Sequence, residues 1–135
     1  MALLARSTGA SGDTTHLQKV PQVSGDLYAG EALDAVAACR IAADGLVYMS
    51  NGTANDASAR FSGFTSRAVA AGQPVTLYRL GARFRYGTGL TVGAQYFVAA
   101  TPGRLDTAAT IGGLVAIAEA VNTTDIQVTL MRAGL

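Results

Sequence analysis

The sequence predicts an all-β fold: a compact β-barrel or β-tulip, or a sandwich of short antiparallel strands, with an extended N-terminal arm. Three observations predict it. From Gly25 onward, short apolar runs alternate with Gly, Asn and Asp turns at the close spacing typical of a barrel or sandwich. The runs are rich in Val, Tyr, Phe and Thr, which favour strands. Half of the 135 residues are apolar and only 14% are charged, so the chain can bury a core.

The chain divides into an arm and one domain. Residues 1–24 are rich in Ser, Thr, Gly and Gln without periodicity and are expected to form the arm, whereas residues 25–135 are expected to form a single β domain. The apolar run at the N-terminus is too short for a secretion signal. The longest uncharged stretch, residues 86–103, is too polar and too often interrupted by glycine to span a bilayer. We therefore expect no membrane contact.

The first predicted hairpin joins strands at residues 39–42 and 46–49, because Asp44-Gly45 is a strong signal for a tight turn. A competing helix over Glu31–Ala43 stays open, since Ala-rich sequence at helical spacing ends just before Gly45. Gly112-Gly113 argue against one long helix over residues 107–121. The remaining strands are expected at residues 60–65, 74–79, 83–86, 95–99, 114–118 and 126–131.

A weak internal duplication links the two halves of the domain. Residues 75–79 (VTLYR) align with residues 128–132 (VTLMR). The same overlay places residues 29–33 near 92–96, and 61–64 near 111–114. Each half would then run from a glycine turn through a hairpin to a closing strand. The overlay needs gaps of different lengths, so chance similarity between glycine-punctuated strands is the alternative.

The composition argues against an enzyme. The net charge is +1, without the basic excess typical of nucleic-acid binding. His16 and Cys39, the single residues of their types, lie far apart and match no metal-ligand spacing. A Cys–His nucleophilic pair is conceivable, but cysteine is among the most often buried residues, so a structural role is favoured for Cys39. The sequence therefore predicts no catalytic, metal-binding or cofactor-binding residue.

One charged feature is a candidate interface patch, formed by Arg79, Arg83, Arg85 and Tyr86. Arg and Tyr are enriched at interfaces, where they stack and donate hydrogen bonds. The competing interpretation is a solvated strand face that alternates arginine outward with an aromatic residue inward. Alternation alone explains the spacing, so the solvated face is favoured and the patch stays a hypothesis.

A series of short motifs follows the arm and covers most of the chain, although no single motif is specific. They are Ala-Gly-Glu-Ala-Leu (29–33), Ala-Asp-Gly (43–45), Phe-Ser-Gly-Phe-Thr (61–65), Ala-Gly-Gln-Pro-Val-Thr-Leu (71–77), Gly-Leu-Thr-Val-Gly-Ala-Gln-Tyr-Phe-Val (89–98), Gly-Arg-Leu (103–105) and Gly-Leu-Val-Ala-Ile-Ala (113–118). This run resembles small head decoration, or cement, proteins of tailed bacteriophages. Related glycine-turn patterns also recur in phage fibre and spike domains.

The resemblance implies a β domain that is made in the host cytoplasm, trimerises on the outer surface of the capsid in the virion and clamps neighbouring major capsid protein subunits. It implies no cofactor, nucleic acid or membrane. The arm would reach the capsid, and its position makes six residues candidate contacts: Leu3, Leu4, His16, Leu17, Lys19 and Val20. The alternative is a receptor- or glycan-binding β domain of a fibre, spike or cell-surface protein. A small enzyme is the third hypothesis.

Overall fold

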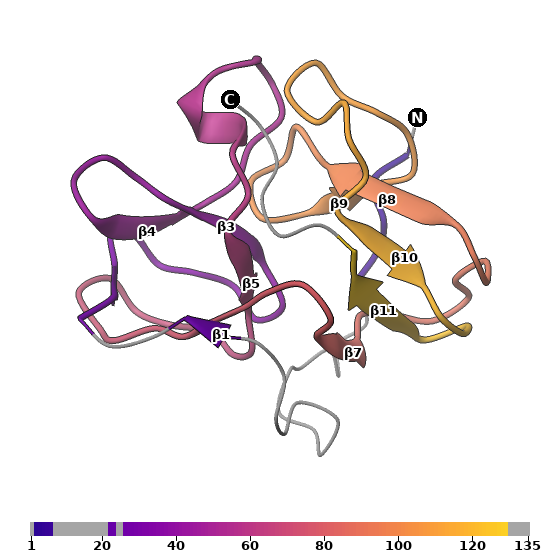
Figure 1. Cartoon of the computed structure of the whole chain (residues 1–135), viewed down its shortest axis with the longest axis horizontal. Coiled ribbons are helices and arrows are strands. Elements are labelled where there is room, and N and C mark those ends of the chain that lie inside the picture. Colours follow the sequence, from indigo (N-terminus) through magenta and orange to yellow (C-terminus); the bar gives the residue numbers. More distant parts are fainter. Residues whose placement is uncertain (1, 7–21, 24–25, 130–135) are drawn as a thin grey trace.

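The computed structural model describes residues 2–6, 22–23 and 26–129. Within these residues the chain is built from short β-strands, and a single 3-10 turn, η2 (Ala57–Ala59), interrupts them. The strands form two lobes that lie side by side (Figure 1). No helix in the described part is both long and apolar enough to cross a membrane. The all-β prediction is confirmed.

The first lobe is a six-stranded sheet that curls into a half-barrel. Its order is β1-β6-β5-β3-β4-β2, and only the β2–β4 pair is parallel. The edge of β2 that does not pair with β4 contacts the segment before β6. There the Ala29 N–H donates to the Gln73 carbonyl at 2.9 Å. The strands are β1 (Gln22–Val23), β2 (Tyr28–Ala29), β3 (Ala38–Ile41), β4 (Leu46–Met49), β5 (Gly63–Thr65) and β6 (Leu77–Tyr78).

The second lobe is a five-stranded antiparallel sheet with the order β7-β11-β10-β8-β9. Its strands are β7 (Arg83–Arg85), β8 (Gln95–Val98), β9 (Leu105–Asp106), β10 (Ala118–Ala120) and β11 (Asp125–Val128). The order β1-β6-β5-β3-β4 of the first sheet has the same pattern, strand for strand. Apart from β2, the two sheets thus repeat one topology. The overlay of residues 75–79 on 128–132 agrees with the equivalent places of β6 and β11, whereas residues 111–114, overlaid on 61–64, lie outside every strand.

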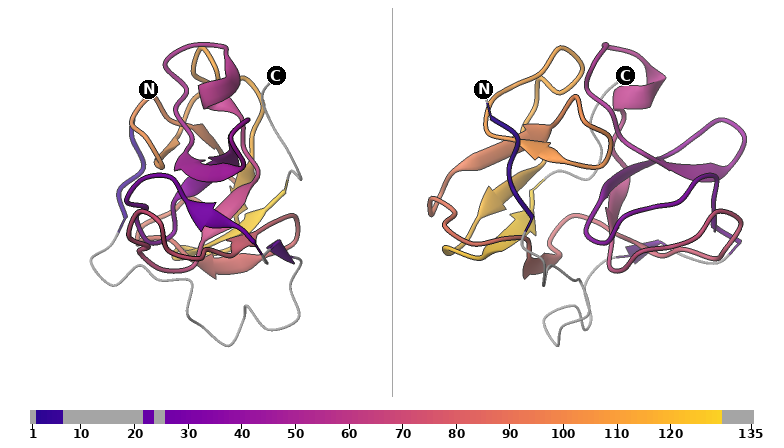
Figure 2. Two further views of the ribbon diagram at one scale, coloured as in Figure 1. Left: turned by 90° about the vertical axis from the view of Figure 1, so that its left-hand side faces the viewer. Right: turned by 180° about the vertical axis from the view of Figure 1, so that it is seen from behind.

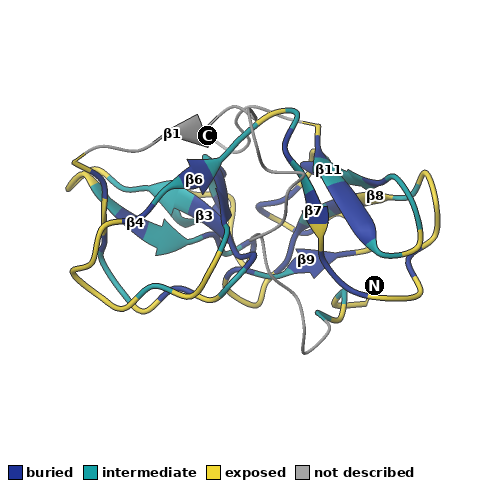
Figure 3. Cartoon of the chain, turned by 90° about the horizontal axis from the view of Figure 1, so that it is seen from below, coloured by how far each residue is buried: buried dark blue, intermediate teal, exposed yellow. Residues whose placement is uncertain are grey.

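One hydrophobic core joins the two lobes. The ring of Phe64 packs edge-on against Phe61 of the same lobe, with centroids 5.2 Å apart, and against Phe84 of the second lobe at 5.1 Å. These three rings belong to a buried cluster that draws on both sheets. A smaller cluster lies within the first lobe around Cys39 and Leu77. Buried strand segments occur in both lobes (Figure 3). Because the larger buried cluster contains residues of both sheets, the lobes share one interior.

The structure corrects several predicted elements. The hairpin around Asp44-Gly45 is confirmed as β3 and β4, and the competing helix does not form. Val36 has a φ of 53°, a left-handed conformation that interrupts any helix through residues 31–43. The strand expected at 114–118 begins only at Ala118. The strand expected at 126–131 is β11, which ends at Val128, and residues 130–131 lie outside the described part. Strands β1, β2 and β9 lie outside every predicted strand.

The beginning of the predicted arm lies on the domain. Residues 2–6, the N-terminal strap, run along β9 (Figure 2). Leu3 forms an antiparallel bridge with Asp106, and the Leu4 N–H donates to the Leu105 carbonyl at 2.7 Å. At the other end of the predicted arm, Gln22–Val23 forms β1 in the first sheet. The described parts of the predicted arm, residues 2–6 and 22–23, therefore both contact the domain.

Candidate interaction surfaces

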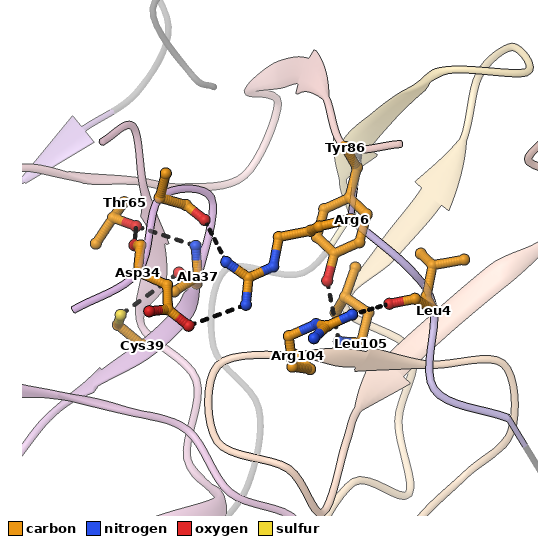
Figure 4. Close-up of polar contacts among 10 residues, drawn as sticks. Leu4, Arg6, Asp34, Ala37, Cys39, Thr65, Tyr86, Arg104 and Leu105 are labelled. Carbon is orange, nitrogen blue, oxygen red and sulfur yellow. Dashed lines mark hydrogen bonds and ion pairs between the residues drawn. The ribbon is translucent and has the colours of Figure 1, made fainter. Parts of the chain in front are cut away.

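The N-terminal strap connects the two lobes through two arginines (Figure 4). From the second lobe, Arg104 Nη2 donates to the Leu4 carbonyl at 2.8 Å. Toward the first lobe, Arg6 Nη1 donates to the Ala35 carbonyl at 2.8 Å, and its Nη2 lies 3.0 Å from Asp34 Oδ2. The Arg6 side chain is 16% exposed, so a charged group is held where water only partly screens it. The strap is thus a structural clasp between the lobes.

Tyr86 lies next to the strap, in the core. Its side chain is fully buried, and its hydroxyl accepts a hydrogen bond from the Leu105 N–H at 3.2 Å (Figure 4). Burial raises the pKa of Tyr86 above its usual value, because the interior penalises the phenolate. A buried ring cannot contribute to a surface patch. The predicted interface patch is therefore reduced to its three arginines.

The three arginines lie on and beside the edge strand β7. Arg83 is half-exposed and its Nε lies 3.2 Å from Asp125 Oδ2, while Arg85 is exposed and Phe84 between them is buried. Arg79, before β7, is half-buried. This alternation matches the solvated strand face. Arginines on an edge strand also discourage pairing with other strands.

Two of the six predicted arm contacts, Leu3 and Leu4, belong to the described residues. Leu3 has 41% of its surface exposed, whereas Leu4 packs against the larger core and is engaged within the chain. His16, Leu17, Lys19 and Val20 lie outside the described residues.

Cys39 is enclosed in the first lobe. Its side chain has no exposed surface, and the thiol donates to the Ala37 carbonyl at 3.4 Å. Burial, together with the nearby Glu31 and Asp34 carboxylates, raises the pKa of the thiol far above its usual value. A thiol in this environment is a poor nucleophile. Among the described residues, no three His, Cys, Asp or Glu side chains gather in a group that could hold a metal ion.

A cluster of exposed apolar side chains lies in the second half of the chain, in residues 111–115, the apolar loop. Ile111, Leu114 and Val115 are 69%, 66% and 55% exposed. Exposed apolar side chains that lie next to one another often mark a binding surface. Sequence reasoning missed this surface because it assigned residues 114–118 to a strand.

The backbone of the apolar loop is fixed by hydrogen bonds. The Gly112 N–H donates to the Gly52 carbonyl at 3.0 Å, and the Gly113 N–H donates to Thr110 Oγ1 at 2.9 Å. Thr110 Oγ1 in turn donates to the Val98 carbonyl at 2.7 Å. A Cβ on Gly112 would collide with the Ala54 carbonyl and the Ala59 side chain, so only glycine allows this close approach. These contacts hold Gly112 and Gly113, which lie between the exposed Ile111 and Leu114.

The first lobe also carries a half-open hollow of about 280 Å³. Hydroxyl groups, an arginine and a tyrosine contribute to its wall. Its lining residues are Thr65, Ser66, Arg67, Val69, Pro74, Val75, Thr76 and Tyr78.

No protein-family model, no curated protein and no solved structure matches this chain.

Proposed function

We propose that this chain is a non-enzymatic decoration protein of a tailed-bacteriophage head. It is made in the host cytoplasm, assembles as a homotrimer on the outer surface of the capsid and stabilises the head by clamping neighbouring major capsid protein subunits. Such a role needs no chemistry at the site, because many weak contacts to a repeating surface add up through avidity.

The observation that best supports the proposal is the apolar loop. The loop exposes Ile111, Leu114 and Val115, and its two glycines are held by hydrogen bonds and close backbone contacts, which lowers the conformational entropy that this part of the loop loses on binding. In contrast, Cys39 is buried, and burial raises the pKa of its thiol. The described part of the chain is thus better equipped to bind a protein surface than to react with a small molecule.

The direct test is sedimentation of a lysate of the producing cells through a density gradient, with antibody detection of the chain. We expect the chain to migrate with particles of capsid size, and to be released when the particles are dissociated. A chain that stays at the top of the gradient as a small species contradicts the proposal.

A pair of variants tests which part of the chain touches the capsid. In the first, His16, Leu17, Lys19 and Val20 are all replaced by alanine, which leaves the N-terminal strap intact. In the second, Arg85→Glu reverses the charge of an exposed side chain on β7. Loss of particle binding in the first variant alone assigns the contact to the arm, whereas loss in the second alone assigns it to the arginine face.

A glycan-binding function is the second candidate, and the hollow in the first lobe is the observation that favours it. Tyr78 offers a partly exposed ring, and the side chains of Ser66 and Thr76 offer hydroxyl groups. Binding of the purified chain to a glycan array, lost in a Tyr78→Ala variant, would favour this candidate over the capsid role.

A further inference from the structure

We propose that Asn51–Gly52 is a deamidation site that the native fold holds closed, and that its reaction frees the apolar loop from its anchor. Asparagine followed by glycine is the sequence in which deamidation is fastest, because glycine has no side chain to hinder ring closure. The pair lies between β4 and η2 and contacts the apolar loop, since the Gly112 N–H donates to the Gly52 carbonyl at 3.0 Å. This chemistry does not depend on the proposed function.

Deamidation at this pair is an attack of the main chain on its own side chain. The Gly52 backbone nitrogen loses its proton to hydroxide or a buffer base and forms a bond with Cγ of Asn51, and the side-chain nitrogen leaves as ammonia. Water then opens the resulting succinimide ring. Cleavage of the bond between the ring nitrogen and Cγ yields aspartate. Cleavage of the bond between the ring nitrogen and the backbone carbonyl carbon yields isoaspartate, in which the main chain passes through the side chain.

In the native structure both reacting groups are held by hydrogen bonds. Gly52 is buried, and its N–H donates to the Ala99 carbonyl at 2.8 Å. The Asn51 Oδ1 accepts a hydrogen bond from the Thr53 N–H at 2.8 Å, and the Asn51 N–H donates to the Ser58 carbonyl at 2.8 Å. An N–H that donates to a buried carbonyl loses its proton less readily, and a main chain bonded on both sides does not rotate to bring the nitrogen onto Cγ. The reaction therefore requires local opening of this segment.

The product does not fit the place that Gly52 occupies. A single added carbon at Gly52 would collide with Thr110 Oγ1 and the Val98 carbonyl, so the main chain is tightly packed there. Isoaspartate lengthens the main chain by one methylene and adds a carboxylate to residues 50–55, which contain no charged side chain. The Gly52 carbonyl is then displaced from the Gly112 N–H. The apolar loop loses an anchor, and the modified chain does not return to its native contacts.

The test compares the deamidation of the purified full-length chain in native buffer and in guanidinium chloride, at the same mildly alkaline pH. Peptide mapping by mass spectrometry measures the fraction of isoaspartate at residue 51. Asn55 and Asn122 serve as internal references, because the aspartate or threonine that follows each of them hinders ring closure. We expect residue 51 to react at least about tenfold more slowly in the native chain, since a local opening free energy of about 1.4 kcal/mol already gives that factor.

A second measurement tests the effect on the apolar loop. The chain is deamidated in denaturant, returned to native buffer and compared with untreated chain by amide hydrogen exchange. We expect faster exchange at Gly112 in the deamidated chain. The matched control is Asn51→Gln, whose longer side chain closes a ring much more slowly. The same treatment should leave the exchange at Gly112 in this variant as it was before treatment.

Three outcomes would overturn the inference. Equal rates at residue 51 in the native and the denatured chain would show that the fold does not close the site. A denatured chain in which residue 51 reacts no faster than Asn55 and Asn122 would show that there is no such site. Unchanged exchange at Gly112 after deamidation would separate the site from the apolar loop. A chain that reacts as expected but does not migrate with particles contradicts only the proposed function.

Discussion

Arg6 Nη2 and Asp34 Oδ2 form an ion pair at 3.0 Å, which ties the fifth residue of the N-terminal strap to the first lobe while the strap itself lies on the second. The Asp34 side chain is 52% exposed, so the ion pair alone contributes little. The hydrogen bond from the same guanidinium to the Ala35 carbonyl is better shielded and adds to it. The strap is therefore part of the stable fold.

The first prediction concerns this clasp. Arg6→Ala should lower the free energy of unfolding by about 1–2 kcal/mol, because it removes the guanidinium that donates to the Ala35 carbonyl and the Asp34 carboxylate. Chemical denaturation measures the loss, and amide hydrogen exchange should be faster at Leu4 and Leu105. Arg85→Ala is the matched control, since Arg85 is exposed and forms no ion pair among the described residues. Equal stability of the two variants would show that the strap does not clasp the lobes.

The second prediction concerns the buried hydroxyl of Tyr86. Tyr86→Phe keeps the ring but leaves the Leu105 N–H without its acceptor, and an unsatisfied buried donor costs about 1–3 kcal/mol. We expect a shift of the denaturation midpoint to lower denaturant with an unchanged slope. Tyr28→Phe, at a ring that is 42% exposed, should leave the midpoint unchanged. The hypothesis fails if both variants behave alike.

The third prediction concerns the anchoring of the apolar loop. Gly112→Ala places a Cβ against the Ala54 carbonyl and the Ala59 side chain, so the loop must move outward. Such overpacking costs about 1–3 kcal/mol. Thermal unfolding measures the loss, and Ala109→Ser, an exposed change in the same segment, is the control. A stable Gly112→Ala protein with unchanged hydrogen exchange at Gly113 would mean that the loop is not held by this contact.

The fourth prediction is a pH dependence at the β3–β4 turn. The Asp44 carboxylate accepts hydrogen bonds from the Leu46 N–H at 2.9 Å and from the Tyr48 hydroxyl at 2.8 Å, and these lower the pKa of Asp44. A group whose pKa is lowered by folding stabilises the protein above its unfolded-state pKa, and loses that contribution as the pH falls through its folded-state pKa. The same hydrogen bond raises the pKa of Tyr48. That contribution is lost at alkaline pH, as the pH rises through the folded-state pKa of Tyr48.

Carbon-detected NMR titration of Asp44 checks this prediction. In Tyr48→Phe the pKa of Asp44 should rise toward its ordinary value, but not fully, because the Leu46 N–H remains. An unchanged Asp44 pKa in this variant would show that the Tyr48 hydroxyl does not stabilise the carboxylate.

The fifth prediction concerns Cys39. Because the thiol is fully buried and its pKa is raised, a thiol reagent such as iodoacetamide should not label the native protein within hours at pH 8. Labelling should become complete in denaturant. Mass spectrometry measures the fraction labelled. Rapid labelling of the native chain would reopen the hypothesis of a nucleophilic cysteine.

Local sequence signals determined much of this protein. The alternation of apolar runs and turns identified the β class, and Asp44-Gly45 identified the first hairpin, because a tight turn with a left-handed glycine is encoded by adjacent residues. The alternation in Arg83–Arg85 likewise matched the observed burial of Phe84 between two outward arginines. These features depend on neighbours within a few positions.

Tertiary structure alone decided the rest. The sequence assigns residues 2–6 to an extended arm. In the structure they lie on β9, more than 100 positions later in the chain, because that edge of the sheet offers unpaired backbone groups. The alternation left two interpretations of Tyr86 open, an interface patch and an inward aromatic residue, and packing decides for the second, because Tyr86 lies in a core drawn from both lobes. Leu114 and Val115 have a strand sequence, yet the strand begins only at Ala118 and both side chains are exposed. Pairing between distant segments is a property of the whole fold, so no local pattern encodes it.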